Sequence, residues 1–469
     1  MNGYLNQNQI NYVLYHMNIV YDLDDIHQDD FLFCKKEMLS AEGKIIFFLS
    51  DEAFDINKTF NIDGIPVLFP LSEMQPSGKW CKIENGNLIF NHDILKSCFY
   101  LLSGYQELEV KERDVYGRFQ YKNSVQRQLN FVDKPLVNYY FKIIIDEIRN
   151  FKENKNILIP RSIFGNFGFM LTHDVDYIDS YTFGNLLYKL KEIMGLSKTY
   201  YSFKKNVLLL FQIIHQLLKF NKKKNPSWTF MYMRSVEEQN GFKSVFYFLN
   251  KDQKNKDSKY TFSDTRIKEL FADIINNNCE IGVHGTVRSA ESQVASERIK
   301  ILLEKESGKK VMGIRQHRLL YKFPQTTRIQ DKAGYKYDTT LCFAEHEGFR
   351  NSFCFPFKLY DFESDKMFNI WEIPLNVMDV TLFHYRKLNI TAAHESINHL
   401  LDEVEKFSGV FTLLWHNDFF NEDRYPGVKE FYETMHKEIS DRNQQNLLGR
   451  EIVDKLKYFS GKFHMTFEK

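Results

Sequence analysis

The sequence predicts an α/β protein in which a parallel sheet or barrel with crossover helices follows a smaller α+β domain. Beyond residue 163, short apolar runs alternate with segments of helical periodicity, which is typical of parallel strands joined by crossover helices. At 469 residues the chain is too long for one ordinary hydrophobic core, whereas a barrel with an added domain accounts for it. The 43% of apolar and 16% of aromatic residues are typical of a globular protein.

The smaller domain is predicted over residues 1–155. Its predicted elements are strands at 44–49 and 65–69 and helices over 93–105 and 135–151. The polar residues 152–156, followed by Pro160, are the expected boundary. We find no catalytic constellation in this part of the chain.

The second predicted domain covers residues 160–469 and has seven strand candidates. They lie at 167–176, 244–249, 279–284, 311–317, 337–341, 370–377 and 410–416, and the clearest helices at 264–277, 290–307 and 391–407. The carboxyl ends of the strands in a parallel barrel converge on one face, which is where such folds place their sites. Ionisable residues stand at these predicted ends: Asp174, Asp176, His284, Arg315, His317, Asp338 and His416.

Asp174 and Asp176 give the first chemical signal. Because they are two residues apart, a regular strand would point both carboxylates to the same face. Two close carboxylates repel each other unless a cation or a shared proton relieves them. A divalent metal bound by one, with the other acting as a base, would do so. The alternative is an Asx turn or a helix cap, because Asp is common in turns after strands.

Two histidines extend this signal. His284 ends a buried strand just before a glycine. Alone, such a residue would be a hydrogen-bonded core histidine, but beside a carboxylate pair its imidazole suits a zinc shell. His416 follows a buried strand in the same way and suits proton donation at neutral pH. Its alternative is a hydrogen-bonded histidine at a strand end.

Five motifs in this order resemble the polysaccharide deacetylase family (NodB homology, carbohydrate esterase 4) over about residues 166–420. They are Thr-His-Asp-Val-Asp at 172–176, Glu-Ile-Gly-Val-His-Gly-Thr at 280–286, Gly-Ile-Arg-Gln-His at 313–317, Tyr-Asp-Thr-Thr-Leu at 337–341 and Leu-Leu-Trp-His-Asn at 413–417. The middle of the chain resembles a bacterial branch of this family whose members carry an extra N-terminal domain and are encoded beside surface-polysaccharide genes.

The resemblance implies a fold, a set of roles and a reaction. The fold is a distorted (β/α)7 barrel. Asp174 would be the general base, Asp176 and His284 would bind a divalent metal, for which zinc is our expectation, and Arg315 would hold the base carboxylate. His416 would protonate the departing amine. The implied reaction removes an acetyl group from an N-acetylated sugar during synthesis of a bacterial surface polysaccharide.

The sequence departs from the family pattern at Arg288, where members commonly carry a second metal-binding histidine. An arginine does not ligate a metal. Three interpretations stay open: His317 supplies the third ligand, which we favour; Thr286 and water complete a weaker shell; or the metal is lost. A lost metal would leave a catalytically silent deacetylase-fold protein that binds glycan or partner enzymes. Hydrolysis of a C–N bond in a non-sugar amide is a third candidate function.

Charge and cysteine content limit the partners and the compartment. The 62 basic and 61 acidic residues nearly cancel, which excludes the broad positive footprint of a protein devoted to nucleic acid. The six cysteines form no CxxC pair, and we expect them to be reduced. The first nine residues have neither the basic start nor the apolar core of a secretory signal. We therefore expect a cytoplasmic protein whose carbohydrate substrate is a nucleotide sugar or a lipid-linked glycan.

An insertion at 184–225 interrupts the alternation of strands and helices. It carries nine lysines, three of them at 222–224, against the single acid Glu192, among apolar residues at helical spacing. Such a segment either makes peripheral contact with an anionic inner membrane or packs as a helical hairpin on the barrel with a solvated lysine face. We favour the packed hairpin, because helix-period apolar residues are more often core. Arg350 is expected either to bind an anionic sugar or phosphate or to be a solvated loop residue.

Overall fold

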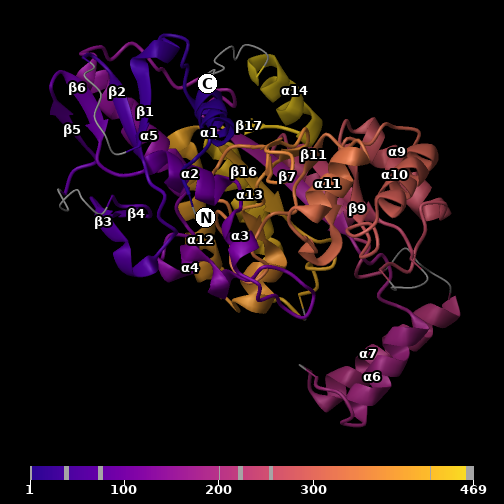
Figure 1. Cartoon of the computed structure of the whole chain (residues 1–469). Coiled ribbons are helices and arrows are strands. Elements are labelled where there is room, and N and C mark those ends of the chain that lie inside the picture. Colours follow the sequence, from indigo (N-terminus) through magenta and orange to yellow (C-terminus); the bar gives the residue numbers. More distant parts are fainter. Residues whose placement is uncertain are drawn as a thin grey trace.

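The computed structural model of the chain is shown in Figure 1. It describes residues 3–35, 42–71, 78–199, 201–219, 225–252, 257–422 and 424–460. The predicted lysine run at 222–224, and the part of the predicted barrel domain after residue 460, lie outside these residues. In the described part of the chain, no helix combines the length and the apolarity that a bilayer span requires.

The N-terminal region contains a four-stranded sheet in the order β1-β2-β6-β5, in which only the β5–β6 pair is antiparallel. Strands β3 and β4 form a separate antiparallel pair. The strands are β1 (Phe31–Lys35), β2 (Ile45–Leu49), β3 (Phe60–Ile62), β4 (Ile65–Val67), β5 (Cys81–Glu84) and β6 (Asn87–Phe90). The helices are α1 (Gln7–Val20), α2 (Ile94–Leu102), α3 (Gln106–Glu109), α4 (Val125–Gln128) and α5 (Leu136–Phe151). The two strands and two helices predicted here are confirmed within a few residues.

The rest of the chain forms a curled, parallel sheet in the order β14-β11-β10-β9-β8-β7-β16-β15, with β17 added beside β7. Its strands are β7 (Gly168–Val175), β8 (Ser244–Leu249), β9 (Glu280–Gly285), β10 (Gly313–Gln316), β11 (Tyr337–Asp338), β14 (Trp371–Glu372), β15 (Val377–Met378), β16 (Val410–Leu414) and β17 (Gln445–Asn446). A short hairpin of β12 (Tyr360–Asp361) and β13 (Lys366–Met367) lies outside it. The predicted α/β class with a barrel-type parallel sheet is confirmed.

Helices follow the strands of this sheet, as crossover connections require. They are α8 (Phe230–Gln239), α9 (Thr265–Asn276), α10 (Gln293–Ser307), α11 (Gln325–Lys332), α12 (Ile390–Phe407), α13 (Val428–Asp441) and α14 (Gly449–Ser460). The three helices predicted at 264–277, 290–307 and 391–407 are thus confirmed. The strands between them are buried along nearly their whole length, which explains why they read as continuous apolar runs rather than alternating ones.

The sixth predicted strand, at 370–377, is two short strands. Its first part, β14, pairs with β11, and its second part, β15, pairs with β16, so this one segment joins the two edges of the curled sheet. Pro374 lies between the two parts. Proline has no N–H to donate to a ladder, so a single continuous strand is interrupted at this point.

Two fully buried tyrosines, Tyr247 and Tyr337, lie close together in the core of the barrel region. Tyr337 donates a hydrogen bond to Glu280 Oε1 at 2.9 Å, and the hydroxyls of Tyr247 and Tyr337 lie 3.3 Å apart. A Cβ atom on Gly313 or on Gly449 would lie 2.1 Å from the Tyr337 ring. Glycine is therefore required at both positions, because only a residue without a side chain leaves room for this ring.

Buried polar contacts join the N-terminal region to the barrel, alongside a shared apolar core. Arg350 is 4% exposed. Its Nη2 donates to both carboxylate oxygens of Glu107, at 2.8 and 2.9 Å. Both expectations for Arg350, anion binding and solvation, are wrong, because an internal carboxylate already neutralises its guanidinium.

Two helices occupy the insertion predicted at 184–225. α6 (Phe183–Ile193) and α7 (Phe203–Lys219) follow β7 and pack against each other. Figure 1 shows the pair standing away from the rest of the molecule. The expectation of a hairpin packed along the barrel is therefore wrong, and the outer faces of both helices are left uncovered.

Candidate active site

A cleft of about 450 Å³ opens at the carboxyl ends of the barrel strands. Its lining includes five of the six residues predicted as site residues: Asp174, Asp176, His284, His317 and His416. The sixth, Arg315, lies directly beneath and is fully buried. The strand ends thus bring together residues as far apart in the sequence as Asp174 and His416. Asp338, the other predicted strand-end residue, instead accepts hydrogen bonds from Gln330 and Thr340 within the core.

Arg315 fixes the orientation of Asp174. Its Nη1 donates to Asp174 Oδ1 at 3.0 Å and to Thr172 Oγ1 at 2.9 Å. Its Nε donates to the Thr339 carbonyl at 2.9 Å, and the guanidinium stacks over the Tyr247 ring at 4.7 Å. Because Nη1, Nη2, Nε and the planar face of this guanidinium all have partners, its position is fixed, and so is that of the Asp174 oxygen that it binds. The second oxygen of Asp174 remains directed to the cleft, 3.6 Å from His284 Nε2.

Asp176, His284 and His317 form a cluster with the geometry of a metal site. One ligand atom from each residue lies within 4.8 Å of the others. Asp176 Oδ1 is 3.2 Å from His284 Nε2, and Asp176 Oδ2 is 3.8 Å from His317 Nε2. Asp176 Oδ1 is buried and has no hydrogen-bond partner. A buried carboxylate oxygen without a partner is costly, and a cation between the three residues would satisfy it.

The hydrogen bonds of Nδ1 in His284 and His317 show that Nε2 is the nitrogen free to bind a metal in each ring. His284 Nδ1 lies 2.9 Å from the carbonyl of Arg315. A carbonyl only accepts, so Nδ1 carries the hydrogen and Nε2 keeps its lone pair in the neutral ring. His317 Nδ1 lies 3.0 Å from Asp257 Oδ1, which assigns its hydrogen in the same way. This arrangement, in which the second nitrogen donates to a carbonyl or carboxylate, is typical of metal-binding histidines, and the N, N, O set suits zinc.

The carboxylates and imidazoles of the cluster shift each other's pKa values. Burial would raise the pKa of the Asp176 carboxyl, but the adjacent imidazoles of His317 and His284 hold it well below its usual range. Burial would lower the pKa of His284, but the carboxylates of Asp174 and Asp176 outweigh burial and raise it. The two carboxylates therefore create a negative field that stabilises positive charge at this point.

His416 stands on the other side of the cleft and is held by a residue that was not predicted. Its Nδ1 lies 2.7 Å from Asp379 Oδ1, and its backbone N–H donates to Asp379 Oδ2 at 2.6 Å. Burial lowers the pKa of His416, but the Asp379 carboxylate outweighs burial and raises that pKa to about 10. The ring is therefore protonated at neutral pH, with Nε2–H free to act as a proton donor.

Arg288, at the position of the missing family histidine, is exposed and does not line the cleft. The hydroxyl of Thr286 accepts from the Ser289 amide at 3.2 Å, within a local turn. Of the three interpretations of the ligand set, the geometry therefore agrees best with His317 as third ligand.

The N-terminal region supplies one wall of the cleft, although its sequence showed no catalytic constellation. Tyr116 and Arg118 line the cleft together with Arg318 and Tyr385. Arg118 Nε pairs with Asp114 at 2.6 Å and Nη1 donates to the carbonyl of Arg318. The guanidinium of Arg318 is exposed and lies over the Tyr116 ring at 5.6 Å. The wall thus presents an aromatic face and a positive charge.

Sequence reasoning missed Asp257, Asp379, Tyr116 and Arg118. Asp379 stands directly after β15, so the strand-end rule would have found it if the sixth predicted strand had been extended by one residue. Asp257 lies in a loop, 60 positions from His317, and no motif marks it. The positions of Tyr116 and Arg118 depend on how the N-terminal region packs on the barrel.

Comparisons with known proteins give two kinds of match, one of sequence in the N-terminal region and one of structure over a larger part of the chain. The pattern of a family of unknown function (DUF7033) matches residues 5–153. No curated protein matches the sequence. The structure is similar to a protein of Mycobacterium smegmatis assigned as a polysaccharide deacetylase, with 17% identity and a TM-score of 0.41, over 62% of this chain and 91% of that chain.

Two further solved structures are similar over about the same share of this chain. One is a probable polysaccharide deacetylase of Pseudomonas aeruginosa PAO1, with 10% identity and a TM-score of 0.39, over 65% of this chain and 93% of that chain. The other is a carbohydrate esterase 4 pseudoenzyme of Bacillus anthracis, with 12% identity and a TM-score of 0.29, over 61% of this chain and 65% of that chain.

Proposed function

We propose that this protein is a metal-dependent hydrolase that removes an acetyl group from an N-acetylated sugar in the synthesis of a bacterial surface polysaccharide. The observation that carries the proposal is one cleft in which Asp176, His284 and His317 present open ligand atoms beside the Arg315-held Asp174. A cation bound there, for which zinc is the best fit, would supply Lewis acidity to the acyl carbonyl and to a hydrolytic water.

Asp174 is the proposed general base. Arg315 occupies one of its oxygens, so the other takes a proton from water as the water oxygen attacks the acetyl carbon. The Arg315 guanidinium also offsets the repulsion between this carboxylate and that of Asp176. The new C–O bond gives a tetrahedral intermediate, whose collapse requires a proton on the leaving nitrogen.

His416 is the proposed source of that proton. The Asp379 carboxylate keeps its ring protonated and fixes Nδ1, so only Nε2–H points to the reacting group. As the C–N bond breaks, the nitrogen leaves as an amine with the proton from His416, and the acyl group leaves as acetic acid, whose hydroxyl proton passes to the released amine to give acetate and an ammonium group. The proton that Asp174 took from water then returns to His416 through solvent, so that both residues regain their starting protonation states.

We propose that the substrate is a nucleotide sugar or a lipid-linked glycan on the cytoplasmic side. Both carry a phosphate next to the sugar, and the exposed guanidinium of Arg318 in the cleft suits such a group. Tyr116 is exposed in the cleft and offers an aromatic side chain against which a sugar packs. All six cysteines are free, which fits a reducing compartment.

A catalytically silent protein that binds glycan is the second candidate, because Arg288 replaces the family histidine. The exposed position of Arg288 and the open Nε2 of His317 favour the enzyme. Hydrolysis of a non-sugar amide would use the same groups and differ only in the substrate.

Acetate release by the zinc-loaded protein from an N-acetylhexosamine linked to a nucleotide diphosphate, and from one linked to a polyprenyl diphosphate in detergent or vesicles, tests this proposal. Because general-base catalysis contributes about 100-fold or more, Asp174→Asn is expected to lower the rate by at least about that factor. Asp402→Asn, at a carboxylate that is 65% exposed on α12, is the matched control and should keep the wild-type rate. Zinc-loaded protein that releases acetate from no sugar would favour the silent protein or the non-sugar amide.

A further inference from the structure

The hairpin of α6 and α7 concentrates exposed apolar side chains. Of the 22 exposed large hydrophobic residues in the described chain, nine lie in residues 183–218: Phe183, Leu187, Tyr188, Met194, Leu196, Phe203, Leu208, Phe211 and Leu218. Phe203 is 69% exposed and Leu218 is 75% exposed. Large apolar side chains that gather on one exposed element in this number are typical of an interaction site.

The spacing of these residues places them on common faces together with lysines. Lys204, Leu208, Phe211, His215 and Leu218 recur every three or four residues and are all exposed, so they share one face of α7. On α6, Leu187, Lys191 and Met194 recur in the same way and are also exposed. The outer surface of the hairpin is therefore apolar and positively charged.

The hairpin cannot bury this surface by itself. Its inner seam holds only a few buried side chains, among them Glu192, Asn206 and Ile213. Lys189 pairs with Glu192 and bonds to Asn206 Oδ1 at 3.1 Å, so the only acidic residue of the hairpin is already neutralised inside the seam. The exposed surface thus carries no negative charge.

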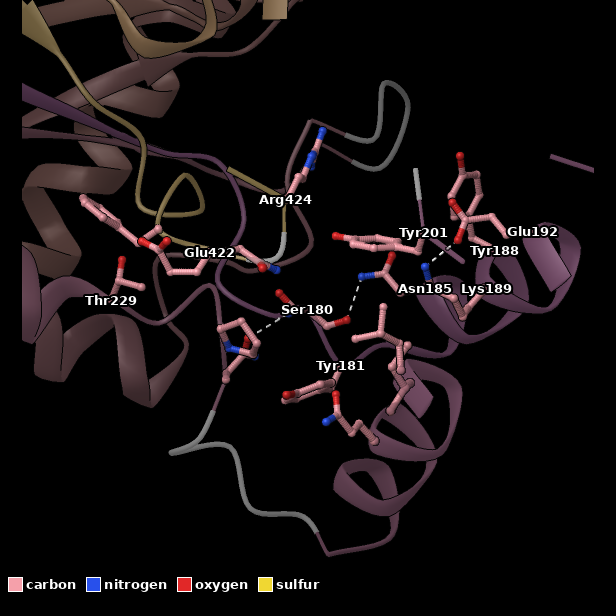
Figure 2. Close-up of a pocket in the computed structure, with 17 residues that line it drawn as sticks. Ser180, Tyr181, Asn185, Tyr188, Lys189, Glu192, Tyr201, Thr229, Glu422 and Arg424 are labelled. Carbon is pink, nitrogen blue, oxygen red and sulfur yellow. Dashed lines mark hydrogen bonds and ion pairs between the residues drawn. The ribbon is translucent and has the colours of Figure 1, made fainter. Parts of the chain in front are cut away.

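The barrel does not cover the hairpin either. Figure 2 shows Tyr181, Asn185, Tyr188 and Lys189 on one side of a hollow, and Glu422 and Arg424 on the other. The hollow has a volume of about 750 Å³ and separates the base of the hairpin from the barrel rim. At this base, Ser180 accepts from Asn185 Nδ2 and its amide donates to Asn225 Oδ1.

The charge of the hairpin distinguishes between two possible partners of this surface, a second copy of the hairpin and an anionic lipid bilayer. Nine lysines and one glutamate give residues 184–225 a formal charge of +8, so the rest of the chain carries −7 of the net +1. A second copy of the hairpin would bring +8 against +8, which is repulsive. An anionic lipid surface instead attracts the lysines while its acyl region takes up the apolar side chains.

We propose that the α6–α7 hairpin docks the protein on an anionic lipid bilayer, with Leu208, Phe211 and Leu218 inserted at the level of the headgroups and the lysines at the phosphates. The negatively charged remainder of the chain is repelled by the same surface, so the hairpin alone makes the contact. The docking does not require that the cleft be catalytic.

The position of the hairpin in the chain gives the docking an orientation. The hairpin begins seven residues after Asp176, in the loop that leaves the carboxyl end of β7. The active-site cleft opens at that same end of the strands. Docking therefore brings the cleft to the membrane side of the barrel. If the proposed function holds, its substrate is the lipid-linked glycan rather than the free nucleotide sugar.

Flotation with lipid vesicles tests the docking without reference to activity. The wild-type protein should float with vesicles of phosphatidylglycerol and phosphatidylcholine and stay behind with phosphatidylcholine alone. The double substitution Leu208→Ser and Phe211→Ser should weaken partitioning about tenfold, because two large apolar side chains no longer leave water. Substitution of Lys191, Lys198 and Lys204 by Gln should weaken it about fivefold per lysine.

The matched control is Val294→Ser with Ile301→Ser on α10, where both side chains are also exposed, at 74% and 64%. This control should float like wild type. Wild-type protein that does not float with the anionic vesicles, or a Leu208→Ser, Phe211→Ser variant that floats equally well, overturns the proposal. A concentration-dependent wild-type dimer without vesicles that this variant abolishes would assign the surface to a second copy. Floating protein without deacetylase activity would contradict only the proposed function.

Discussion

Each histidine of the candidate site has one ring nitrogen committed and one open. His284 and His317 use Nδ1 for a carbonyl and for Asp257, and His416 uses Nδ1 for Asp379. The hydrogen-bond partner of Nδ1 distinguishes the roles of the three histidines. The first two open nitrogens face Asp176 and the cation position, whereas His416 is paired so strongly with a carboxylate that its pKa rises to about 10.

The pH dependence of stability tests the His416–Asp379 pair. Because the folded-state pKa of His416 lies above its usual 6.5, the pair stabilises the metal-free fold fully below about pH 6.5, and this stabilisation is lost as pH rises through about 10. In metal-free protein, Asp379→Asn should lower the free energy of unfolding by on the order of 3 kcal/mol at about pH 6.

Chemical denaturation of wild type and variant at both ends of this range is the measurement. The difference between the two proteins should shrink to less than about 1 kcal/mol at about pH 10.5, since the ring is then neutral in both states. A difference that does not change with pH would mean that Asp379 acts through its bond to the His416 amide rather than through the charge of the ring.

Every site residue that the sequence predicted stands at or just after the carboxyl end of a barrel strand, but Asp379, which follows β15 in the same way, was missed. Asp174, His284 and His416 follow long apolar runs, and parallel strands must bring such residues to one rim. Asp257 has no such signal, because it contacts His317 across a loop rather than along a strand. The sequence already favoured His317 over Thr286 as third ligand, and the geometry supports that preference, because the Thr286 hydroxyl accepts within a local turn while His317 Nε2 lies 3.8 Å from Asp176 Oδ2.

At the scale of elements, the curled sheet and its N-terminal neighbour are held by polar pairs as well as by apolar packing. The Glu107–Arg350 pair links α3 to the segment between β11 and β12, and both side chains are at most 5% exposed. The prediction for Arg350 was wrong because a sequence does not show which internal carboxylate a loop arginine will meet. The split of the sixth strand, in contrast, was readable from Pro374.

Removal of one partner tests the Glu107–Arg350 link. Glu107→Gln should lower the free energy of unfolding by about 3 kcal/mol or more, because it leaves the Arg350 guanidinium buried without a counter-charge. Asp402→Asn is the control, since the Asp402–Arg442 pair is at the surface and should contribute less than about 1 kcal/mol. Urea denaturation measures both. Equal losses for the two variants would contradict a structural role for the buried pair.

At the scale of the whole molecule, the sequence predicts what the barrel contributes to the cleft but not what the N-terminal region contributes. The strand order of the barrel domain expected at 160–469 brings the candidate site residues to one rim, and the apolar runs in the sequence indicate these strands. The region at 1–155 contributes Tyr116 and Arg118 to the cleft through its packing, which no local pattern reveals. We therefore propose that these two ranges, although separate in sequence character, act as one site-forming unit, with the hairpin at 184–225 as its attachment to lipid.

The amount of zinc bound per chain after dialysis tests the central claim most directly. The wild-type protein should retain about one zinc, and His317→Ala should bind it at least about 100-fold more weakly, because even the loss of a residue that only orients a ligand costs up to that factor. His399→Ala, at a histidine that is 47% exposed on α12, should bind like wild type. Wild-type protein that stays free of metal, or a His317→Ala variant that retains zinc with wild-type affinity, would contradict the account.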